Sequence, residues 1–237
     1  MSISYVATAT AVTSTITDAS LACNVPTGTT DGDVMVAIVS RPSGTATVST
    51  PSGWDVLSGF PVQNSGGITL AGFYRVASSE PASYTFSFST GKCLIAISSY
   101  RGVDNTTPVH QSAAATDTTN RTTHTSPSIT TTVANCWTIA GYADRGFTSA
   151  STWSTPTGLT SRSGNLVTTG TNDNSLATFD SNADKTAGSY SYASTASASQ
   201  SNACMCTVAL APAPPSVPAP QAVPLVMRQA VARSALR

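Results

Sequence analysis

Charged side chains are scarce in this chain. They make up 9% of its 237 residues, against roughly 25% in an average soluble domain, and the two signs balance. Glu80 is the only glutamate, and His110 and His124 are the only histidines. Enzymes cluster ionisable groups around their substrates, and nucleic-acid-binding domains carry a basic patch. The composition therefore argues against catalysis and against binding to nucleic acid.

Targeting and membrane-spanning segments are also missing from the sequence. The N-terminus, residues 1–5, lacks the basic region and the apolar stretch of a signal peptide. No apolar run approaches the ~18 residues of a membrane helix. We therefore expect a protein that is made in a cytoplasm and does not insert into a membrane. If it works outside the cell, it leaves by lysis or by a dedicated route.

Cysteine is present in an odd number and without CxxC spacing, which argues against a disulfide framework and against a zinc site. All but Cys23 lie in apolar strand-like runs, where we expect them to be buried as small apolar side chains. Cys204 and Cys206 should point to the same face of one strand, which is poor geometry for bonding each other. The five are Cys23, Cys93, Cys136, Cys204 and Cys206.

Serine and threonine are abundant instead, at about three residues in ten. Short runs of strand-forming residues recur between Gly, Pro, Asn and Asp, and helical periodicity is almost absent before residue 225. The clearest runs are Val34–Val39, Ile68–Val76, Tyr84–Phe88, Cys93–Tyr100, Cys136–Tyr142 and Ala203–Leu210. About ten strands predict one all-β domain over residues 1–211, a two-sheet antiparallel β-sandwich. A jelly-roll-like strand order is our prediction, and an immunoglobulin-like order stays open.

Two polar stretches, Asp104–Thr132 and Ala143–Asn174, interrupt this pattern. They predict long loops, which on a rigid sandwich are where binding usually occurs. The alternative is that they decorate exposed sheet edges.

After Leu210 the composition changes abruptly. Residues 212–224 are rich in Ala and Pro and predict an extended, semi-rigid linker. Residues 225–237 predict a short basic amphipathic tail, which is either frayed or docks on a partner. The candidate partner-binding residues of this tail are Leu225, Met227, Arg228, Val231, Arg233 and Arg237.

Motifs for chemistry are weak. His110 and His124 lie in a polar stretch without a nucleophile-elbow sequence, and we expect both in exposed loops. A glycosidase needs two carboxylates facing one cleft, whereas Asp31 and Asp33 are neighbouring turn residues. We predict no catalytic residues.

Asp180, Asn182 and Asp184 place oxygen ligands at alternate positions, as a calcium loop begins. Lys185 stands where that loop has glycine, and no glutamate closes it. An ordinary turn is the favoured interpretation, with calcium as the alternative, and no other cofactor is expected.

Three tryptophans have different surroundings. We expect Trp137 in the core and Trp54 to close one end of the sandwich. Trp153 lies in the second polar stretch. If exposed, it would stack on a sugar ring; otherwise it packs beneath its own loop.

Four segments together resemble a known family: Gly32–Val39, Pro51–Leu57, Phe73–Phe86 and Ala96–Asp104. They are similar to β-sandwich domains of virion proteins from tailed bacteriophages of actinobacteria, especially minor tail and capsid-associated proteins. The resemblance covers about residues 30–142 and brings no catalytic residues. It implies an accessory protein of the virion.

The leading hypothesis is therefore a non-enzymatic structural protein that decorates the capsid or tail and aids adhesion to host surfaces. Its partners would be other virion proteins, further copies of itself and host glycans. The alternative is a carbohydrate-binding module that uses Trp153. A hydrolase is a third and weaker alternative.

Overall fold

The computed structural model describes residues 2–146 and 150–215. Every regular element in these residues is a β-strand, and every strand pairing is antiparallel. The predicted all-β sandwich is confirmed. Across the described ranges, no helix is long and apolar enough to span a membrane.

The chain has more strands than the sequence predicted. The first half contains β1 (Ser4–Thr13), β2 (Ser20–Asn24), β3 (Val34–Arg41), β4 (Asp55–Val56), β5 (Val62–Asn64), β6 (Ile68–Val76), β7 (Ser83–Ser87) and β8 (Cys93–Arg101). The second half contains β9 (Val109–Asp117), β10 (Arg121–Thr125), β11 (Ile129–Thr131), β12 (Trp137–Gly146), β13 (Thr160–Val167), β14 (Asp173–Asp180), β15 (Gly188–Tyr190), β16 (Ala193–Gln200) and β17 (Ala203–Leu210).

Each half contributes one large sheet. The strand order is β1-β8-β3-β6-β4 in the first, where β5 also pairs with β6, and β13-β14-β12-β17-β9 in the second. The sheets pack face to face, and their facing side chains form a common core. Ile38 and Leu70 enter it from the first sheet, and Ile139 and Val208 from the second. This shared core joins the two halves.

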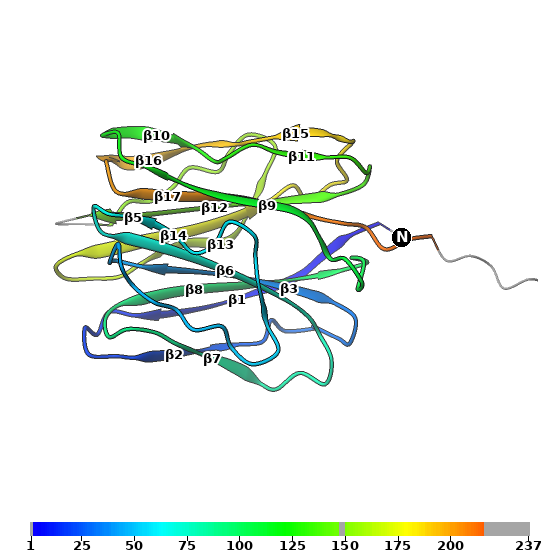
Figure 1. The fold of residues 1–237 in the computed structure, drawn as a ribbon, viewed down its shortest axis with the longest axis horizontal. Helices are drawn as coiled ribbons and strands as arrows, with labels where there is room; N and C mark the ends of the chain where they lie inside the picture. Colours follow the sequence, from blue (N-terminus) through cyan, green and yellow to red (C-terminus); the bar gives the residue numbers. More distant parts are fainter. Residues whose placement is uncertain (1, 147–149, 216–237) are drawn as a thin grey trace, which may run out of the picture.

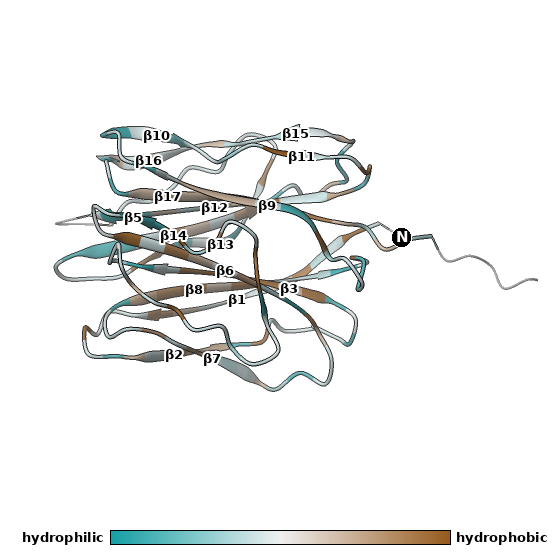
Figure 2. Ribbon diagram, viewed as in Figure 1, coloured by the Kyte–Doolittle hydropathy of each residue, from teal (hydrophilic) through white to brown (hydrophobic). Residues whose placement is uncertain are grey.

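Two-stranded ribbons cover the outer faces of both sheets (Figure 1). The β2–β7 ribbon packs on the first sheet through Phe86. The β10–β16 and β11–β15 ribbons lie over the second sheet, where Ala196 packs beside Phe179. The central strands are therefore covered on both faces. This explains why Val34–Val39 and Ala203–Leu210 are apolar almost throughout (Figure 2).

The two halves repeat one topology. In the first half β1 pairs with β8, and β8 also pairs with β3. In the second half β9 pairs with β17, and β17 also pairs with β12. Registers agree as well. Val39 of β3 pairs with Ala71 of β6, and Tyr142 of β12 pairs with Ala177 of β14; all four face the outer ribbons. The sandwich is thus built from two equivalent units.

Short sequences mark the same equivalence. Ser49–Gly53 and Ser154–Gly158 differ at one position, Ser52 against Thr157. In both, the amide of the following residue donates to the proline carbonyl at 3.1 Å, and the glycine has a φ of +77°. Leu70–Phe73 and Leu176–Phe179 also match except at their third residue. The sequence therefore carries an internal repeat that its strand pattern had not indicated.

The prediction of long polar loops is wrong. Asp104–Thr132 contains β9, β10 and β11, and Ala143–Asn174 contains β13 and the adjoining ends of β12 and β14. Hydroxyl-rich strands lack the apolar alternation by which a strand is recognised, although threonine fits a pleated sheet well. β9 and β13 are edge strands, as the alternative of edge decoration predicts.

The cysteine prediction is confirmed. All five thiols are free and buried. Cys204 and Cys206 both face the common core from β17, on one side of the strand.

The sandwich has two distinct ends. The N-terminus and the segment after β17 leave at one of them, which we call the arm end (Figure 1). β3 finishes at the opposite end with Arg41, where β8 and β14 begin next to Lys92 and at Asp173. We call this the far end.

Candidate functional site

The base of the arm is held in the sandwich. Pro212 forms a bridge with Val103, and the amide of Ala213 donates to the carbonyl of Gly102 at 2.8 Å. These contacts join the chain that follows β17 to the turn after β8. They fix the direction in which the chain leaves the domain.

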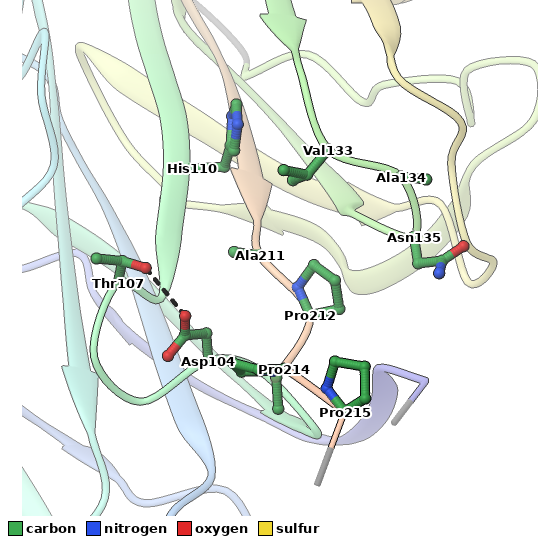
Figure 3. A pocket seen from close by; sticks show the side chains of 11 residues that line it. Asp104, Thr107, His110, Val133, Ala134, Asn135, Ala211, Pro212, Pro214 and Pro215 are labelled. Atoms are coloured by element: carbon green, nitrogen blue, oxygen red, sulfur yellow. Dashed lines mark hydrogen bonds between the residues drawn. The ribbon is translucent and has the colours of Figure 1, made fainter. Parts of the chain in front are cut away.

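A pocket of about 370 Å³ lies beside this exit (Figure 3). His110 in its wall shares a 3.1 Å hydrogen bond between Nε2 and Oγ1 of Thr132, and its Nδ1 is buried without a partner among the described residues. The amide of Thr106 donates to Asp104 and lowers the pKa of that carboxyl. The pocket is lined by Asp104, Thr107, His110, Val133, Ala134, Asn135 and residues 211–215.

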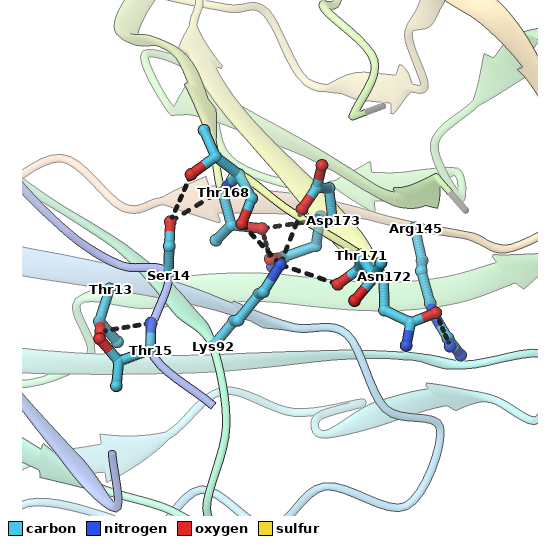
Figure 4. Close-up of polar contacts among 11 residues, drawn as sticks. Thr13, Ser14, Thr15, Lys92, Arg145, Thr168, Thr171, Asn172 and Asp173 are labelled. Carbon is cyan, nitrogen blue, oxygen red and sulfur yellow. Dashed lines mark hydrogen bonds and ion pairs between the residues drawn. The ribbon is translucent and has the colours of Figure 1, made fainter. Parts of the chain in front are cut away.

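Lys92 is the centre of a polar network at the far end (Figure 4). Its Nζ lies 2.8 Å from each of three acceptors: the carbonyls of Thr169 and Thr171 and Oδ1 of Asp173. The ammonium therefore has all three donors satisfied, although only 4% of the side chain is exposed. The network holds the start of β8 against the start of β14.

Neighbouring contacts extend the network across the far end. Arg145 donates from Nη2 to Oδ1 of Asn172 at 2.6 Å. Asn172 also borders a second pocket, of about 280 Å³, that opens beside Lys92 and Arg41.

His124 is not an exposed loop residue, and that prediction is wrong. It lies in β10 with no exposed surface, beneath the ribbon that β10 forms with β16. Its Nδ1 lies 3.0 Å from Oδ2 of Asp117, and its Nε2 lies 3.1 Å from the carbonyl of Arg121. Both ring nitrogens are occupied, so no side-chain hydroxyl is placed to be activated as in a Ser-His-Asp device. His110 is likewise in a strand, β9, and is half-buried.

The carboxylate of Asp117 is held charged by its neighbours. Burial alone would raise its pKa, but donation from the amide of Thr119 and from the Arg121 and His124 side chains outweighs burial, so the pKa is lowered. The pair with His124 is a structural contact of the closed interior.

Trp153 is also buried, with 3% of its surface exposed, so it does not offer the exposed ring considered for sugar stacking. Its backbone bridges to Ala196, and its indole Nε1 donates to Oγ of Ser175 at 2.8 Å. The ring packs against Tyr142, with centroids 5.3 Å apart. The alternative, packing beneath its own segment, is what the structure has.

The other tryptophans are buried too. Trp137 lies in the core as predicted and donates from Nε1 to Asp184 at 3.0 Å. Trp54 lies under the β2–β7 ribbon against Tyr84 and Phe86, on the outer face of the first sheet rather than at an end of the sandwich.

The calcium candidates are engaged by an arginine. Arg162 forms two bonds with the carboxylate of Asp180, at 2.7 and 2.8 Å, and a third with Oδ1 of Asn182 at 2.7 Å. The amide of Asn182 donates to Asp180, which makes the ordinary Asx turn favoured from the sequence. Within residues 2–146 and 150–215, no group of three or more His, Cys, Asp or Glu side chains could hold a metal ion.

The carboxylates tested for paired acid chemistry have separate structural partners. Asp33 bonds Arg101 through both oxygens at 2.7 and 2.8 Å, whereas Asp31 accepts from the amide of Ser79. Glu80 binds Arg75 at 2.8 Å. None of these pairs leaves a free carboxylate facing a second one across a cleft.

The thiols are unsuited to nucleophilic chemistry. Burial raises the pKa of four of them to about 12, so the thiolate is absent at neutral pH. These four are Cys23, Cys93, Cys204 and Cys206.

Sequence reasoning missed the buried cations of the far end. Arg41 and Lys92 are 2% and 4% exposed. Each adjoins an apolar strand, Arg41 as the last residue of β3 and Lys92 just before β8. A charge directly beside a strand that is buried on both faces was the available signal. The predicted tail, 225–237, lies outside the described residues.

No family, curated protein or solved structure matches this chain.

Proposed function

We propose that the chain is a non-enzymatic accessory protein of a bacteriophage particle, attached to the capsid or tail through its C-terminal arm. The observation that carries the proposal is the fixed exit of the arm, where Pro212 and Ala213 are bonded to the turn after β8. The N-terminus leaves at the same end (Figure 1). Anchoring at the arm end leaves the far end pointing outward.

Two further features support this role. Four sequence segments resemble virion β-sandwich domains, which gives the class of particle. The ionisable groups tested for chemistry are engaged in structural contacts, as Asp180 is with Arg162 and Asp117 with His124.

The arm provides reach and a contact. Beyond Pro212 and Ala213, which are bonded to the sandwich, a linker over 214–224 would span roughly 34 Å at ~3.1 Å per residue if extended. The tail that follows combines apolar Met227 and Val231 with Arg228 and Arg233. We expect it to contact another virion protein.

A second copy of the chain is the partner we propose for β1. From Ala7 to Thr13 this edge strand carries no charge and no proline, and among the described residues it pairs with β8 alone. Natural edges are guarded by charge, bulges, shortness or a cover. β4 and β5 are short, β13 has a register shift and Arg162, and β9 has a register shift and ends in Asp117. Antiparallel pairing of β1 with its copy gives a two-fold dimer.

The alternative of a carbohydrate-binding module loses its predicted contact surface. An aromatic ring must expose a face to stack on a sugar, and Trp153 does not. No other feature of the described residues favours that function.

The test is rebinding to particles that lack the protein, made from a phage in which its gene is interrupted. Full-length chain and a 1–215 truncation are added separately, and bound copies are counted by quantitative mass spectrometry. We expect the full chain to bind and the truncation to bind at least about tenfold less, because it keeps the sandwich and the arm base but loses the tail. Electron microscopy of immunolabelled particles then places it on head or tail.

A Met227→Asp, Val231→Asp double variant keeps the arm's length and tests its apolar contact. Lys185→Gln, a change within the sandwich, is the control and should rebind fully. Full binding by the truncation would move attachment to the sandwich. Failure of the full chain to bind any particle would reject the virion role.

A further inference from the structure

Arg41 is a buried cation that forms no ion pair within residues 2–146 and 150–215. It ends β3 at the far end, and 2% of it is exposed. Nε donates to the carbonyl of Lys92 at 2.6 Å and Nη2 to that of Thr90 at 3.2 Å. The guanidinium lies 4.3 Å from the centre of the Phe88 ring. These neighbours orient the group, but none of them carries a negative charge.

The remaining nitrogen, Nη1, is buried and has no partner among the described residues. None of the ion pairs in those residues includes Arg41. Burial lowers the pKa of Arg41, yet a guanidinium stays protonated at neutral pH. Buried charges are normally paired, and an unpaired buried donor in a native fold calls for a partner such as a bound ion or water.

Arg41 is one of the residues that line the pocket of about 280 Å³. Lys92 is also in its wall, but Asp173 neutralises that charge, so the charge of Arg41 stays uncompensated. Ser43, Thr90 and Asn172 add polar side chains to the wall. The volume is just below the roughly 300–1,000 Å³ of pockets for drug-sized ligands. It suits one small polar group.

Gly91 keeps the wall close to the guanidinium. Its φ is +137°, and a Cβ at this position would lie 2.9 Å from Nη2 of Arg41. Its amide is already used, since it donates to the carbonyl of Asp18 at 2.8 Å. The loop at Gly91 therefore lies close to the guanidinium and brings no carboxylate to it.

We propose that this far-end pocket binds an oxyanion, a carboxylate or a phosphate, with Arg41 as the cation that recognises it. A planar guanidinium forms charge-assisted bonds with both groups and is the side chain best suited to them. Two sources share this chemistry: the uronic acids or phosphates of an acidic surface polysaccharide, and free phosphate in solution. Binding does not depend on the proposed attachment of the arm and is measurable on the isolated protein.

The experiment titrates the full-length chain with sodium phosphate, sodium glucuronate and a uronic-acid oligosaccharide at low ionic strength. Amide chemical shifts by NMR report binding. We expect shifts at Ser43, Gly91 and Asn172, and Arg41→Met should weaken binding by about tenfold or more. Lys185→Gln removes one positive charge at the arm end and should leave binding unchanged. Arg41→Lys, which keeps the charge but loses the planar fork, should bind more weakly than the native chain and covers the case in which Arg41→Met does not fold.

The three probes distinguish free phosphate from an acidic polysaccharide as the ligand. Phosphate and glucuronate binding with similar affinity would support a small-oxyanion site. Tighter binding of the oligosaccharide would support a polysaccharide ligand. No shift with any of the three probes up to ~50 mM, or equal affinity in the native chain and both Arg41 variants, would overturn the proposal.

Discussion

Lys92 and Asp173 connect the two halves of the sandwich through an ion pair, with Nζ and Oδ1 2.8 Å apart. Both side chains are at least nine-tenths buried. The carbonyls of Thr169 and Thr171 complete the coordination of the ammonium. A pair that is buried and fully bonded is sensitive to loss of either member, because the other charge is then left alone in the interior.

Lys92→Met should therefore lower the free energy of unfolding by about 3–5 kcal/mol. The variant leaves Asp173 and two carbonyls without their donor. Urea denaturation followed by tryptophan fluorescence measures the change. Lys185→Met, which has no ion pair in the described residues, should stay within about 0.5 kcal/mol of the native chain. Equal effects of the two variants would contradict the structural role of the pair.

Acid should weaken the contact between Asp33 and Arg101. Burial opposes ionisation of Asp33, but bonds from Arg101 and Thr30 outweigh it and lower the pKa of the carboxyl. A lowered pKa stabilises the fold above the unfolded value, roughly 3.9, and that stabilisation is lost as the pH falls through the folded value. Asp33→Asn should therefore be less stable than the native chain at pH 7. The difference in stability should shrink as the pH falls to about 2–3, where the native carboxyl is protonated as well.

Urea midpoints across that pH range measure this linkage. Arg101→Gln provides the matched test, because it removes the partner and keeps the carboxyl. It too should destabilise the fold at pH 7 and show a smaller loss in acid. A stability difference between Asp33→Asn and the native chain that is constant with pH would refute the assignment.

Trp153 should act as a core residue. Trp153→Ala is expected to cost about 3–5 kcal/mol, because it leaves a cavity against Tyr142 and removes the donor to Ser175. Ser175→Ala removes the acceptor of the indole and also the two bonds between Oγ and Asp144, so it should cost at least about 1–3 kcal/mol without opening a large cavity. Denaturant midpoints measure both variants. A Trp153→Ala variant of native stability that has lost glycan binding would instead restore the exposed-ring interpretation.

The apolar strands could be predicted because burial on both faces requires apolar side chains along the whole strand. β3, β8 and β17 are covered on both faces, so nearly every residue in them must be apolar. Polar β10 and β16 could not be found in this way. They lie in an outer ribbon, and their Ser and Thr side chains give no alternating pattern.

The candidate site was less predictable than the fold. Arg41 and Lys92 are adjacent to apolar runs, but their burial depends on loops distant in sequence, such as Thr169–Asp173. His124 is buried because the β10–β16 ribbon packs on the second sheet, where the His124 ring lies against Trp153. The ribbon itself forms by pairing across about 70 residues of chain. The internal repeat, by contrast, was visible in the matching segments Ser49–Gly53 and Ser154–Gly158.

The open edge of β1 should govern self-association. Thr10 is exposed in the middle of the regular part of the strand. Thr10→Lys places a charge there, which natural sheets use to prevent edge pairing. Light scattering after size-exclusion chromatography should show a dimer for the native chain and a monomer for the variant. Thr160→Lys, at the exposed start of edge strand β13, is the control and should leave the dimer intact. A native chain that is monomeric at all concentrations would exclude β1 pairing.

The repeated turns offer a matched comparison within one molecule. Gly53 and Gly158 have the same φ of +77°, so alanine at either position adopts a left-handed conformation that costs about 1–2 kcal/mol. A Cβ at Gly158 would meet nothing within 4 Å, whereas at Gly53 it would lie 2.2 Å from Nη1 of Arg75. That guanidinium is held by Glu80 and by the carbonyl of Gly53.

Gly53→Ala should therefore destabilise the chain more than Gly158→Ala, by roughly the 1 kcal/mol of a displaced side-chain contact. Urea denaturation of the two single variants measures the difference. Adding Arg75→Ala to both variants is the control, because it removes the obstructing group and should bring the two costs together. If the costs stay apart without Arg75, the turns differ in backbone conformation, and the equivalence of the two halves does not extend to them.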